Sequence, residues 1–348
     1  MRKTKFRVGI IGTGGVFRWA HIPGWKSIPD AEIVAVADVN VASAAAVAKE
    51  LNVPHVFADF RELVKLDLDA VDVCTPNAVH TPAVLAALKA GKHVLCEKPL
   101  ATTTADVRRM GQLADRKKLK LMTAQHQRFT ASARAIKSWA DAGNLGKVYH
   151  ARVRAMRRAW LPVRPGFISK KLSGGGPCMD IGVHALDCCL WMMGFPKPVR
   201  VTGTAKVNFA KGHTIPGLWG EWDRKKFDVE DFAAGFVHFD NGATMTLETA
   251  WLGHQAENED MSFQLFGFNG GVKWPAAEFA SVAGRALTHG TLTCAEKVDK
   301  PHTDEVKAFY DCVVNRKPSP VPWTESIRVI AILEAIYKSQ QTGREVNL

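Results

Sequence analysis

The feature that most constrains this fold is a regular alternation of short apolar segments and helix-like stretches over the first 125 residues. The strand candidates are Phe6–Ile11, Glu32–Ala37, Ala70–Cys74, His93–Cys96 and Lys120–Thr123. The helical stretches between them are Val16–Ser27, Ala42–Leu51, Phe60–Leu66, Thr81–Ala90 and Thr104–Arg116. Near-continuous apolar strands separated by helices are typical of a parallel sheet that is covered on both faces. Because its crossovers are right-handed, this part is predicted to be a doubly wound α/β fold.

The pattern changes from about Leu145. Longer strands with weak alternation are predicted at Val148–Met156, Val199–Val207, Asp231–Phe239, Ala243–Ala250 and Ser262–Gly267. They are interrupted by one helix, from about Met179 to Met193, and Asn241-Gly242 marks a hairpin between two of them. This order predicts an α/β domain with an open, mainly antiparallel sheet. Helices at Thr303–Asn315 and Thr324–Gln341 close the chain, the latter with Thr324 as N-cap and Gly343 as its stop.

Two domains follow from the length of 348 residues and from this change of pattern. We expect one domain over residues 1–126 and a second over 127–348, whose C-terminal helix can pack back on the first domain.

Composition excludes several classes of protein. Hydrophobic residues make up 47% and charged residues 23% of the chain, as in ordinary globular proteins. No apolar run approaches the roughly 20 residues that cross a bilayer, and the apolar stretch after the basic start is too short for a signal peptide. The seven cysteines are an odd number and include no C-x-x-C pair, which argues against a disulfide framework or a zinc knuckle and favours a reducing compartment, the cytoplasm. No third nitrogen or sulfur ligand stands at a suitable spacing from Asp180 and His184, so no metal is expected.

The net charge of +12 is spread along the chain rather than gathered into a nucleic-acid-binding motif. We therefore expect neither a nucleic-acid nor a membrane partner, and interpret most of this charge as a solvated surface.

A glycine turn follows the first predicted strand directly. Its segment Gly12, Thr13, Gly14, Gly15, Val16 and Phe17 opens the first helix, where backbone amides without neighbouring Cβ atoms can hold a pyrophosphate. The third glycine of the G-x-G-x-x-G fingerprint is replaced by Phe17, so the turn is wider than usual or the phenyl ring faces the core. Taken alone, the abbreviated motif is equally consistent with a structural turn.

Polar residues at the ends of later strands support the nucleotide interpretation. Asp38 ends the second strand, where an acidic residue hydrogen-bonds an adenosine ribose. Its neighbours Val39 and Asn40 are not basic, which favours NAD over NADP, and Asp38 as an N-cap is the structural alternative. Thr75, Pro76 and Asn77 end the next central strand at the same edge, so dinucleotide binding is predicted.

Two groups of residues are suited to acid–base chemistry. Lys98 stands in Glu97-Lys98-Pro99 at the end of the fifth strand, where a cis bond before Pro99 would fix its direction; a solvated lysine is the alternative. Asp180, His184 and Asp187 share one helix face, and a carboxylate one turn from a histidine orients a general base. The three preceding glycines would let a substrate or cofactor approach. A capping Asp180, a buried His184 and a structural Asp187 are the alternatives.

These residues resemble the Gfo/Idh/MocA oxidoreductases nearly end to end. The resemblance is carried by the glycine turn with His21, by Thr75-Pro76-Asn77 with His80, by Glu97-Lys98-Pro99, by Gln127-Arg128-Phe129 and by the Gly174-to-Asp187 block with its D-x-G-x-H-x-x-D pattern. It implies that residues 1–126 form an NAD-binding Rossmann domain. It also implies that residues 127–348 form a substrate-binding and oligomerisation α/β domain, whose open sheet is the expected interface of a homodimer or homotetramer. The activity it implies is oxidation of a secondary alcohol on a sugar, glycoside or cyclitol.

The resemblance also implies roles for individual residues. Lys98, Asp180 and His184 would be catalytic, with His184 accepting the hydroxyl proton, Asp180 orienting it and Lys98 hydrogen-bonding the reacting oxygen. Besides the glycine-turn segment and Asp38, the expected NAD contacts are Thr75, Pro76, Asn77, His80, Glu97, Lys98 and Gln127. Gln127 is also an expected substrate contact, although many relatives have asparagine there.

An arginine-rich segment, in which Arg157, Arg158 and Trp160 stand out, allows two interpretations. The functional one is that an arginine, with Trp160 as an apolar platform, binds an anionic group of the substrate. The structural one is an exposed sheet face that pairs with acidic residues of a neighbouring subunit.

Three functions are compatible with these residues. The first is an NAD-dependent dehydrogenase of a sugar, glycoside or cyclitol. The second is a glycosidase or lyase that holds NAD tightly, oxidises C3 transiently, eliminates the aglycone and reduces the sugar again, on a neutral or an anionic sugar. The third is a non-catalytic sensor that binds the dinucleotide. We take the first as the prediction.

Overall fold

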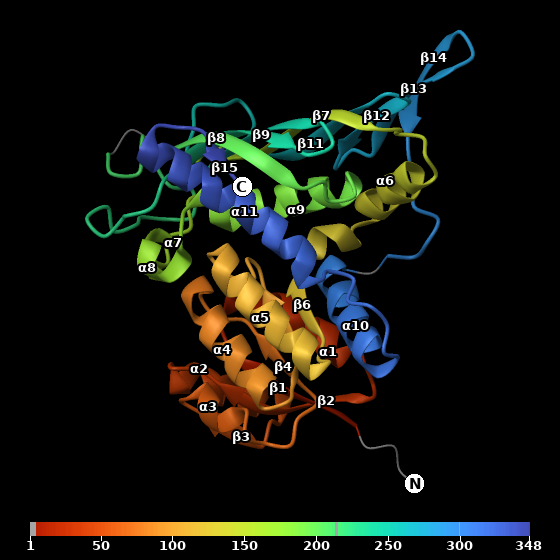
Figure 1. Ribbon diagram of the computed structural model, residues 1–348. Coiled ribbons are helices and arrows are strands. Elements are labelled where there is room, and N and C mark those ends of the chain that lie inside the picture. Colours follow the sequence, from red (N-terminus) through yellow and green to blue (C-terminus); the bar gives the residue numbers. More distant parts are fainter. Residues whose placement is uncertain (1–4, 213–214, 299) are drawn as a thin grey trace. The chain divides into compact units, whose positions relative to one another are not determined.

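The computed structural model describes residues 5–212, 215–298 and 300–348, and their contacts divide the chain into two units (Figure 1). Unit 1 comprises the described residues within 1–126 and 299–327, and unit 2 those within 127–298 and 328–348. The sequence analysis assigned all of 127–348 to the second domain, whereas residues 299–327 belong by contact to unit 1.

Unit 1 is built on a six-stranded parallel sheet in the order β3-β2-β1-β4-β5-β6, the strand order of a Rossmann fold. Its strands are β1 (Phe6–Ile11), β2 (Ala31–Ala37), β3 (His55–Phe57), β4 (Ala70–Val73), β5 (His93–Glu97) and β6 (Leu121–Ala124). The helices are the π turn η1 (Phe17–His21), α1 (Ile22–Lys26), α2 (Val41–Leu51), α3 (Phe60–Leu63), α4 (Asn77–Lys89), α5 (Thr104–Lys117) and α10 (Pro301–Val314).

Burial explains why these segments form strands. All four residues of β4 and of β6 are buried, as expected where helices cover both faces of a sheet. The five predicted strands of this unit are confirmed to within one residue. The sequence analysis missed β3, whose three residues include two exposed ones and show no apolar run.

Residues 299–327 complete unit 1 through α10, which packs against α1. Phe6 meets Tyr310 edge to face with ring centroids 5.2 Å apart, and Trp25 meets Phe309 in the same way at 6.2 Å. These aromatic contacts bury an apolar face that residues 1–126 alone leave uncovered. Among the described residues, no helix combines the length and apolarity that crossing a bilayer requires.

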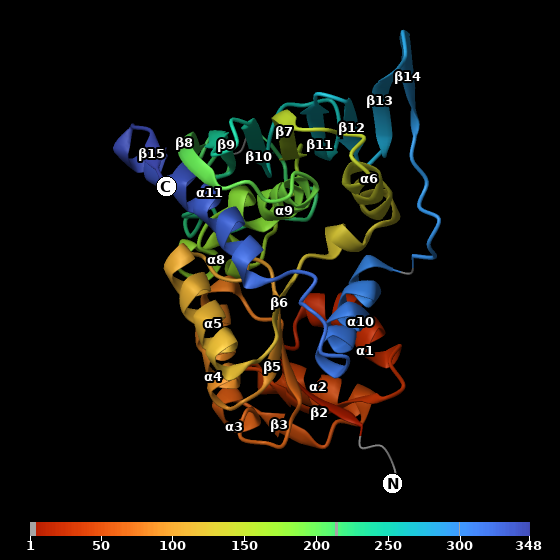
Figure 2. The same cartoon turned by 45° about the vertical axis from the view of Figure 1, so that its right-hand side comes forward.

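Unit 2 contains a nine-stranded sheet in the order β14-β13-β12-β11-β7-β10-β9-β8-β15 (Figure 2). The strands are β7 (Val148–Arg157), β8 (Pro198–Lys206), β9 (Phe232–Phe239), β10 (Thr244–Ala250), β11 (Glu259–Gly267), β12 (Gly270–Trp274), β13 (Glu278–Ala283), β14 (Ala286–Thr291) and β15 (Val346–Asn347). The helices are the 3₁₀ turn η2 (His126–Phe129, which begins in unit 1), α6 (Ala131–Asp141), α7 (Pro165–Ile168), α8 (Lys170–Ser173), the π turn η3 (Cys178–Gly182), α9 (Val183–Met192) and α11 (Trp323–Thr342, which spans both units).

The predicted antiparallel character of this sheet is confirmed, with β7 and β10 as a parallel pair at its centre. The hairpin at Asn241-Gly242 joins β9 to β10 as expected, and Gly242 has a φ of +84°. The sequence analysis missed β12, β13 and β14. The hairpin of β13 and β14 extends beyond the rest of the sheet in Figure 1. The sequence analysis placed the N-cap of α11 at Thr324, but the helix already begins at Trp323.

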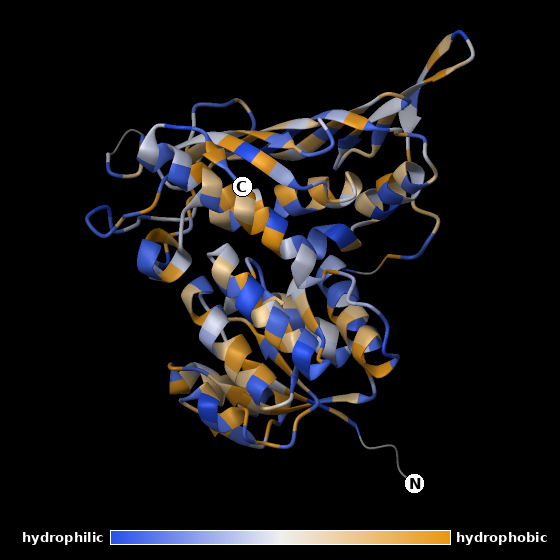
Figure 3. Ribbon diagram, viewed as in Figure 1, coloured by the Kyte–Doolittle hydropathy of each residue, from blue (hydrophilic) through white to orange (hydrophobic). Residues whose placement is uncertain are grey.

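The two faces of the sheet differ in their side chains. Ala151, Val153 and Ala155 of β7 are fully buried on the side of α9, whereas Arg152 and Arg154 lie on the other, exposed face. Figure 3 shows hydrophilic and hydrophobic residues alternating along these strands. One face is therefore open, as predicted from the period-2 pattern.

Candidate active site

The glycine turn after β1 has two glycines with different steric requirements. Gly12 has a φ of +96°, and a Cβ there would lie 2.5 Å from the carbonyl oxygen of Cys74, so a side chain is excluded. A Cβ at Gly14 would meet nothing within 4 Å. The turn is thus packed tightly against β4 on one side and open on the other, which leaves room for a pyrophosphate beside Gly14.

The amides of this turn are divided between internal and available donors. Thr13 donates its N–H to Asp38 Oδ2 at 2.8 Å, so this amide is used within the chain. Arg18 N–H donates to Gly14 O at 3.2 Å. The four amides between them, from Gly14 to Phe17, are the N-terminal ones that a helix leaves for solvent or a ligand. The Phe17 side chain is fully buried, so its ring faces the core. Only its backbone N–H is then suited to contact a bound pyrophosphate.

Asp38 follows β2 and fixes the neighbouring turn. Besides Thr13 N–H, it accepts the hydroxyl of Thr13 at 3.0 Å and the N–H of Asn40 at 2.8 Å. The N-cap of α2 is Asn40, whose side chain accepts from Ser43 N–H, so the alternative of Asp38 as N-cap is wrong. Arg18, which the sequence analysis overlooked, donates to the carbonyls of Thr13 and Ser43 close by.

The end of β4 supplies Thr75, Pro76 and Asn77. The Thr75 Oγ1 atom is buried and has no hydrogen-bond partner among the described residues, as expected for a group that awaits a ligand. His80 lies behind this edge, fully buried, with its two ring nitrogens 2.8 and 2.9 Å from the carbonyls of Pro99 and Thr75. Its ring therefore joins two edge turns, which does not support the predicted direct contact of His80 with the cofactor.

Glu97 and Lys98 end β5. Glu97 is 6% exposed and accepts the backbone N–H of Lys98 at 3.0 Å, so this carboxylate faces inward rather than toward a cofactor. Burial alone would raise the pKa of Glu97, but the hydrogen bond and charge of His21 lower it to about 2. Lys98 is half-buried, and the Lys98–Pro99 peptide bond is cis, as the sequence analysis considered.

The nucleotide-site residues of unit 1 therefore share one edge. In a parallel sheet the ends of β1, β2, β4 and β5 lie together, and a ligand binds where the strand order reverses, here between β1 and β4. The open space at Gly14 and the unpartnered Thr75 hydroxyl both fit a bound dinucleotide at this edge.

Asp180 and His184 belong to unit 2, on η3 and on the first turn of α9. The expected uniform α-helix is instead a π turn at Asp180 that continues as α-helix from Val183; such turns are frequent at functional sites. Asp180 is half-buried and His184 is 9% exposed. The indole N–H of Trp251, at the end of β10, donates to Asp180 Oδ2 at 3.2 Å.

Two of the three glycines before this helix are required by close packing; whether they also admit a ligand, as the sequence analysis expected, stays a prediction. A Cβ at Gly175 would lie 2.1 Å from the hydroxyl of Tyr337, and one at Gly176 would lie 2.0 Å from the carbonyl oxygen of Glu230. The buried Glu230 carboxylate accepts from the N–H groups of Gly176 and Cys178 at 2.9 and 3.2 Å, and from Tyr337 at 2.8 Å. Burial raises the pKa of Glu230.

Asp187 lies in the core of unit 2. It is fully buried and forms a two-pronged ion pair with Arg128, in which Nε and one terminal nitrogen are each 2.7 Å from a carboxylate oxygen. The structural alternative for Asp187 is therefore supported. The ion pair also joins two of the family motifs, because Arg128 belongs to Gln127-Arg128-Phe129 and Asp187 ends the Gly174-to-Asp187 block. Gln127 is half-buried on η2, beside Arg128.

The arginine segment ends β7. Arg157 pairs with Glu259 at 2.7 Å and lies over the Trp219 ring at 4.9 Å, while Arg158 is exposed. Trp160 stacks on Trp219 with ring centroids 6.0 Å apart. The expected exposed face exists, but Arg154 pairs with Glu248 and Asp260 of its own chain.

Two further residues that the sequence analysis missed make their contacts over long distances along the chain. Trp251 is 71 residues from Asp180, and Glu230 is 54 residues from Gly176. No local pattern marks either residue.

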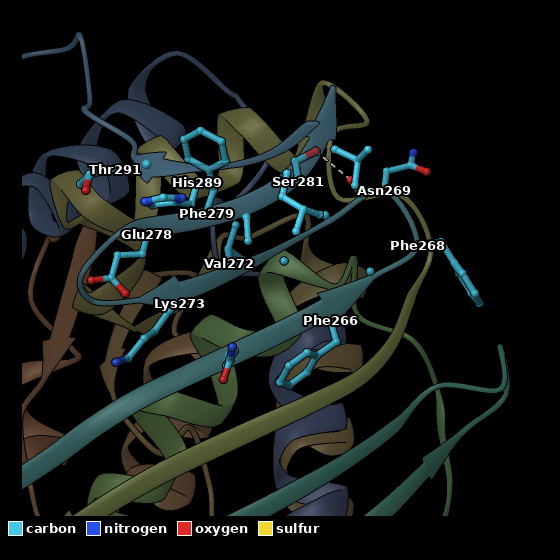
Figure 4. A pocket seen from close by; sticks show the side chains of 18 of the residues that line it. Phe266, Phe268, Asn269, Val272, Lys273, Glu278, Phe279, Ser281, His289 and Thr291 are labelled. Atoms are coloured by element: carbon cyan, nitrogen blue, oxygen red, sulfur yellow. Dashed lines mark hydrogen bonds between the residues drawn. The ribbon is translucent and has the colours of Figure 1, made fainter. Parts of the chain in front are cut away.

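A separate hollow of about 670 Å³ lies on β11 to β14 and includes none of the predicted site residues. Figure 4 shows Phe266, Val272 and Phe279 around it, with the Phe268 ring turned outward at the rim.

A parallel sheet with Rossmann strand order, in a chain that also carries a mixed, mainly antiparallel sheet, is the architecture expected of a two-domain NAD-dependent oxidoreductase. Family models agree: residues 6–125 match the oxidoreductase family with an NAD-binding Rossmann fold, and residues 133–273 match the GFO/IDH/MocA C-terminal domain. The chain belongs to the GFO/IDH/MocA oxidoreductase family, and the resemblance inferred from the sequence is confirmed.

Relatives cover the whole chain. The D-glucoside 3-dehydrogenase of Escherichia coli (strain K12) is 33% identical over 353 residues, covering 100% of this chain and 99% of the relative. The myo-inositol 2-dehydrogenase of Thermotoga maritima is 26% identical, covering 98% of each chain. The solved structure of a levoglucosan dehydrogenase in complex with NADH has the same fold, with a TM-score of 0.81, 22% identity and 99% coverage of each chain.

Proposed function

We propose that this protein transfers hydride between a secondary hydroxyl of a glucoside or a related sugar and NAD. The observation that carries the proposal is the end-to-end identity of 33% with a D-glucoside 3-dehydrogenase. It is supported by the presence in this chain of Lys98, Asp180 and His184, which are suited to acid–base chemistry. A levoglucosan dehydrogenase and a myo-inositol dehydrogenase, each 26% identical to this chain, broaden the candidate substrates to anhydrosugars and cyclitols.

Each residue would have a distinct part in this reaction. The bound dinucleotide, held along Gly14–Phe17, Asp38 and Thr75–Asn77, supplies the hydride acceptor. His184 takes the proton of the reacting hydroxyl, and Asp180, oriented by the indole of Trp251, stabilises the resulting imidazolium. The Lys98 ammonium hydrogen-bonds the same oxygen and stabilises its negative charge as the C–H bond breaks.

The test is the His184→Ala variant. We expect kcat to fall by roughly 10²–10⁴-fold, the usual contribution of a positioned general base, while the Kd for NAD stays close to the wild-type value. Rates are followed as NADH absorbance with methyl glucoside, levoglucosan and myo-inositol as substrates.

The matched control is His289→Ala, on the exposed β14 hairpin, which should keep full activity. Wild-type turnover in His184→Ala would remove His184 from the site. Cleavage of a glycoside without net NADH would instead identify the redox-assisted glycosidase.

The arginine segment suggests a secondary specificity. We propose that Trp160 lines the substrate site and that the exposed Arg158 is available to an anionic group, since Arg157 already pairs with Glu259. A uronate should then react faster than the neutral sugar at low salt, and the advantage should disappear in Arg158→Ala. Equal rates for both sugars at every salt concentration would contradict this.

We also propose a homodimer or homotetramer formed through the open face of the unit 2 sheet, in the cytoplasm. Exposed aromatic residues on and beside that face, Tyr149, Phe236 and Phe268, support an interface. All seven cysteines are free thiols, which suits a reducing compartment. In analytical ultracentrifugation the wild type should sediment as a dimer or tetramer, and Phe236→Asp should sediment as a smaller species. A monomeric wild type would contradict the proposed assembly.

A further inference from the structure

A buried chain of charges connects the middle of the unit 1 sheet to Lys98. His21, the last residue of η1, is fully buried with its Nδ1 2.8 Å from Asp72 Oδ2 and its Nε2 3.0 Å from Glu97 Oε1. The other oxygen of Glu97 accepts the backbone N–H of Lys98 at 3.0 Å. Asp72, His21, Glu97 and Lys98 thus form a continuous series of contacts across β4, η1 and β5.

The geometry defines the protonation of His21. Both of its ring nitrogens lie within hydrogen-bond distance of carboxylate oxygens, an arrangement that favours the doubly protonated imidazolium. Burial alone would lower the pKa of His21, but the Asp72 carboxylate raises it well above its usual range. The Asp72 carboxylate is itself held by the indole N–H of Trp25 at 2.8 Å.

Glu97 needs this cation because it is almost completely buried. An isolated carboxylate in such a place takes up a proton instead of keeping its charge, whereas a close cation stabilises the charged form. The titratable groups around Glu97 are His21, Asp72, Cys74, His80, Cys96, Lys98, His126 and His302. Burial, together with neighbouring cations, lowers the pKa of His126 to about 3 and that of His302 to about 4, so neither can replace the charge of His21 above pH 5.

We propose that His21 is a positioning residue for Lys98 and acts through Glu97. The imidazolium fixes one oxygen of Glu97, the other oxygen fixes the peptide N–H of Lys98, and the ammonium is thereby aimed at the edge where the sheet binds its ligand. On the far side of the same turn, His80 holds the carbonyl of Pro99 at 2.8 Å. This inference rests on the proposed role of Lys98 and adds a residue to which no role in the reaction has been given.

The experiment is a double-mutant cycle of His21→Gln and Glu97→Gln in the holoenzyme, with Lys98→Met as reference. We expect His21→Gln to lower kcat by roughly 10–100-fold, since small misplacements of a catalytic group have effects of this size. The Kd for NAD should change less than about twofold, because the Gly14–Phe17 amides are untouched. In the Glu97→Gln background, His21→Gln should lower kcat no further.

The pH profile separates positioning from a general effect on stability. With His21→Gln, the buried Glu97 loses its cation and titrates within the range of assay, so the acid limb of log kcat should steepen from a slope of one to a slope of two. The double variant should return to a slope of one. The matched control is His93→Gln, at the opposite end of β5, where the ring accepts Lys120 N–H; its kcat should equal that of the wild type.

Each outcome decides the matter. Wild-type kcat in His21→Gln, or additive losses in the cycle, would overturn the inference, because His21 would then act otherwise than through Glu97. If His21→Gln does not fold, Glu97→Gln alone tests the second half of the chain, and full wild-type kcat in that variant would overturn it. Undiminished turnover in Lys98→Met would instead refute the proposed function, which keeps the two failures distinct.

Discussion

At the scale of single residues, glycines occupy this fold for opposite reasons. Gly176 is required because the carbonyl oxygen of Glu230 lies where its Cβ would be, whereas Gly14 faces open space. The first glycine holds the Asp180 helix against Glu230 and Tyr337, and the second leaves the nucleotide edge accessible. The sequence shows both only as glycine-rich turns.

The two positions predict opposite behaviour on substitution. Gly176→Ala should lower the free energy of unfolding by about 1–3 kcal/mol, the usual cost of overpacking, as measured by urea denaturation. Gly14→Ala should leave that free energy nearly unchanged but weaken NAD binding, because its Cβ enters the space beside the turn. A stable Gly176→Ala protein, or unaltered NAD affinity in Gly14→Ala, would contradict the respective half.

Which residues the sequence reveals at this scale depends on how far apart the contacting groups lie along the chain. Lys98, Asp180 and His184 stand in short motifs with meaningful spacing, so they could be proposed from the sequence. Trp251 and Glu230 contact the Asp180 segment from β10 and from the segment before β9, and only the folded sheet brings them there. Neither residue stands in a recognisable motif, so the sequence around Trp251 or Glu230 does not indicate a contact with the Asp180 segment.

At the scale of elements, each unit places a π turn at its candidate site. The turn η1 follows the glycine turn and ends at His21, and η3 carries Asp180 directly before α9. Neither was predicted, because a helical pattern of apolar residues does not distinguish an α turn from a π turn over five residues. Strands β12 to β14 were also missed, since β13 and β14 are mostly exposed and lack a buried face.

The helix α9 is anchored by a buried ion pair, which gives a stability prediction. Asp187→Ala removes the carboxylate that pairs with the buried Arg128 guanidinium, so the free energy of unfolding should fall by about 3–5 kcal/mol. Thermal and urea unfolding measure it. Glu62→Ala, which removes the exposed partner of Lys65, is the control and should cost less than about 1 kcal/mol. Equal effects of the two substitutions would contradict the structural role of Asp187.

At the scale of the whole molecule, the chain passes between the two units more than once. It enters unit 2 after residue 126, returns to unit 1 for residues 299–327 and ends in unit 2. The returning α10 brings His302 onto His126, with ring centroids 3.9 Å apart. The sequence predicted the helix itself, but the surface it covers depends on aromatic contacts with Phe6 and Trp25 that no local pattern encodes.

This stacked pair predicts a loss of stability in acid. Burial holds the pKa of His302 at about 4, below the ordinary value of 6.5, so the unfolded chain binds more protons between these pH values. The free energy of unfolding should therefore fall as the pH is lowered from 6.5 to 4, with His302 contributing up to one proton to the slope. Urea titrations at several pH values should show a shallower slope in His302→Asn and an unchanged one in His289→Asn. Parallel slopes in all three proteins would refute this.

The repeated passage of the chain between units has a practical consequence for dissecting the enzyme. A truncation after residue 126 would strip the Rossmann sheet of α10 and expose Phe6 and Trp25 to water, so such a fragment should aggregate even though its own sheet is complete. Neither half can be exchanged with a relative by a single crossover. A chimaera that respects this architecture needs three junctions, at 126/127, 298/299 and 327/328.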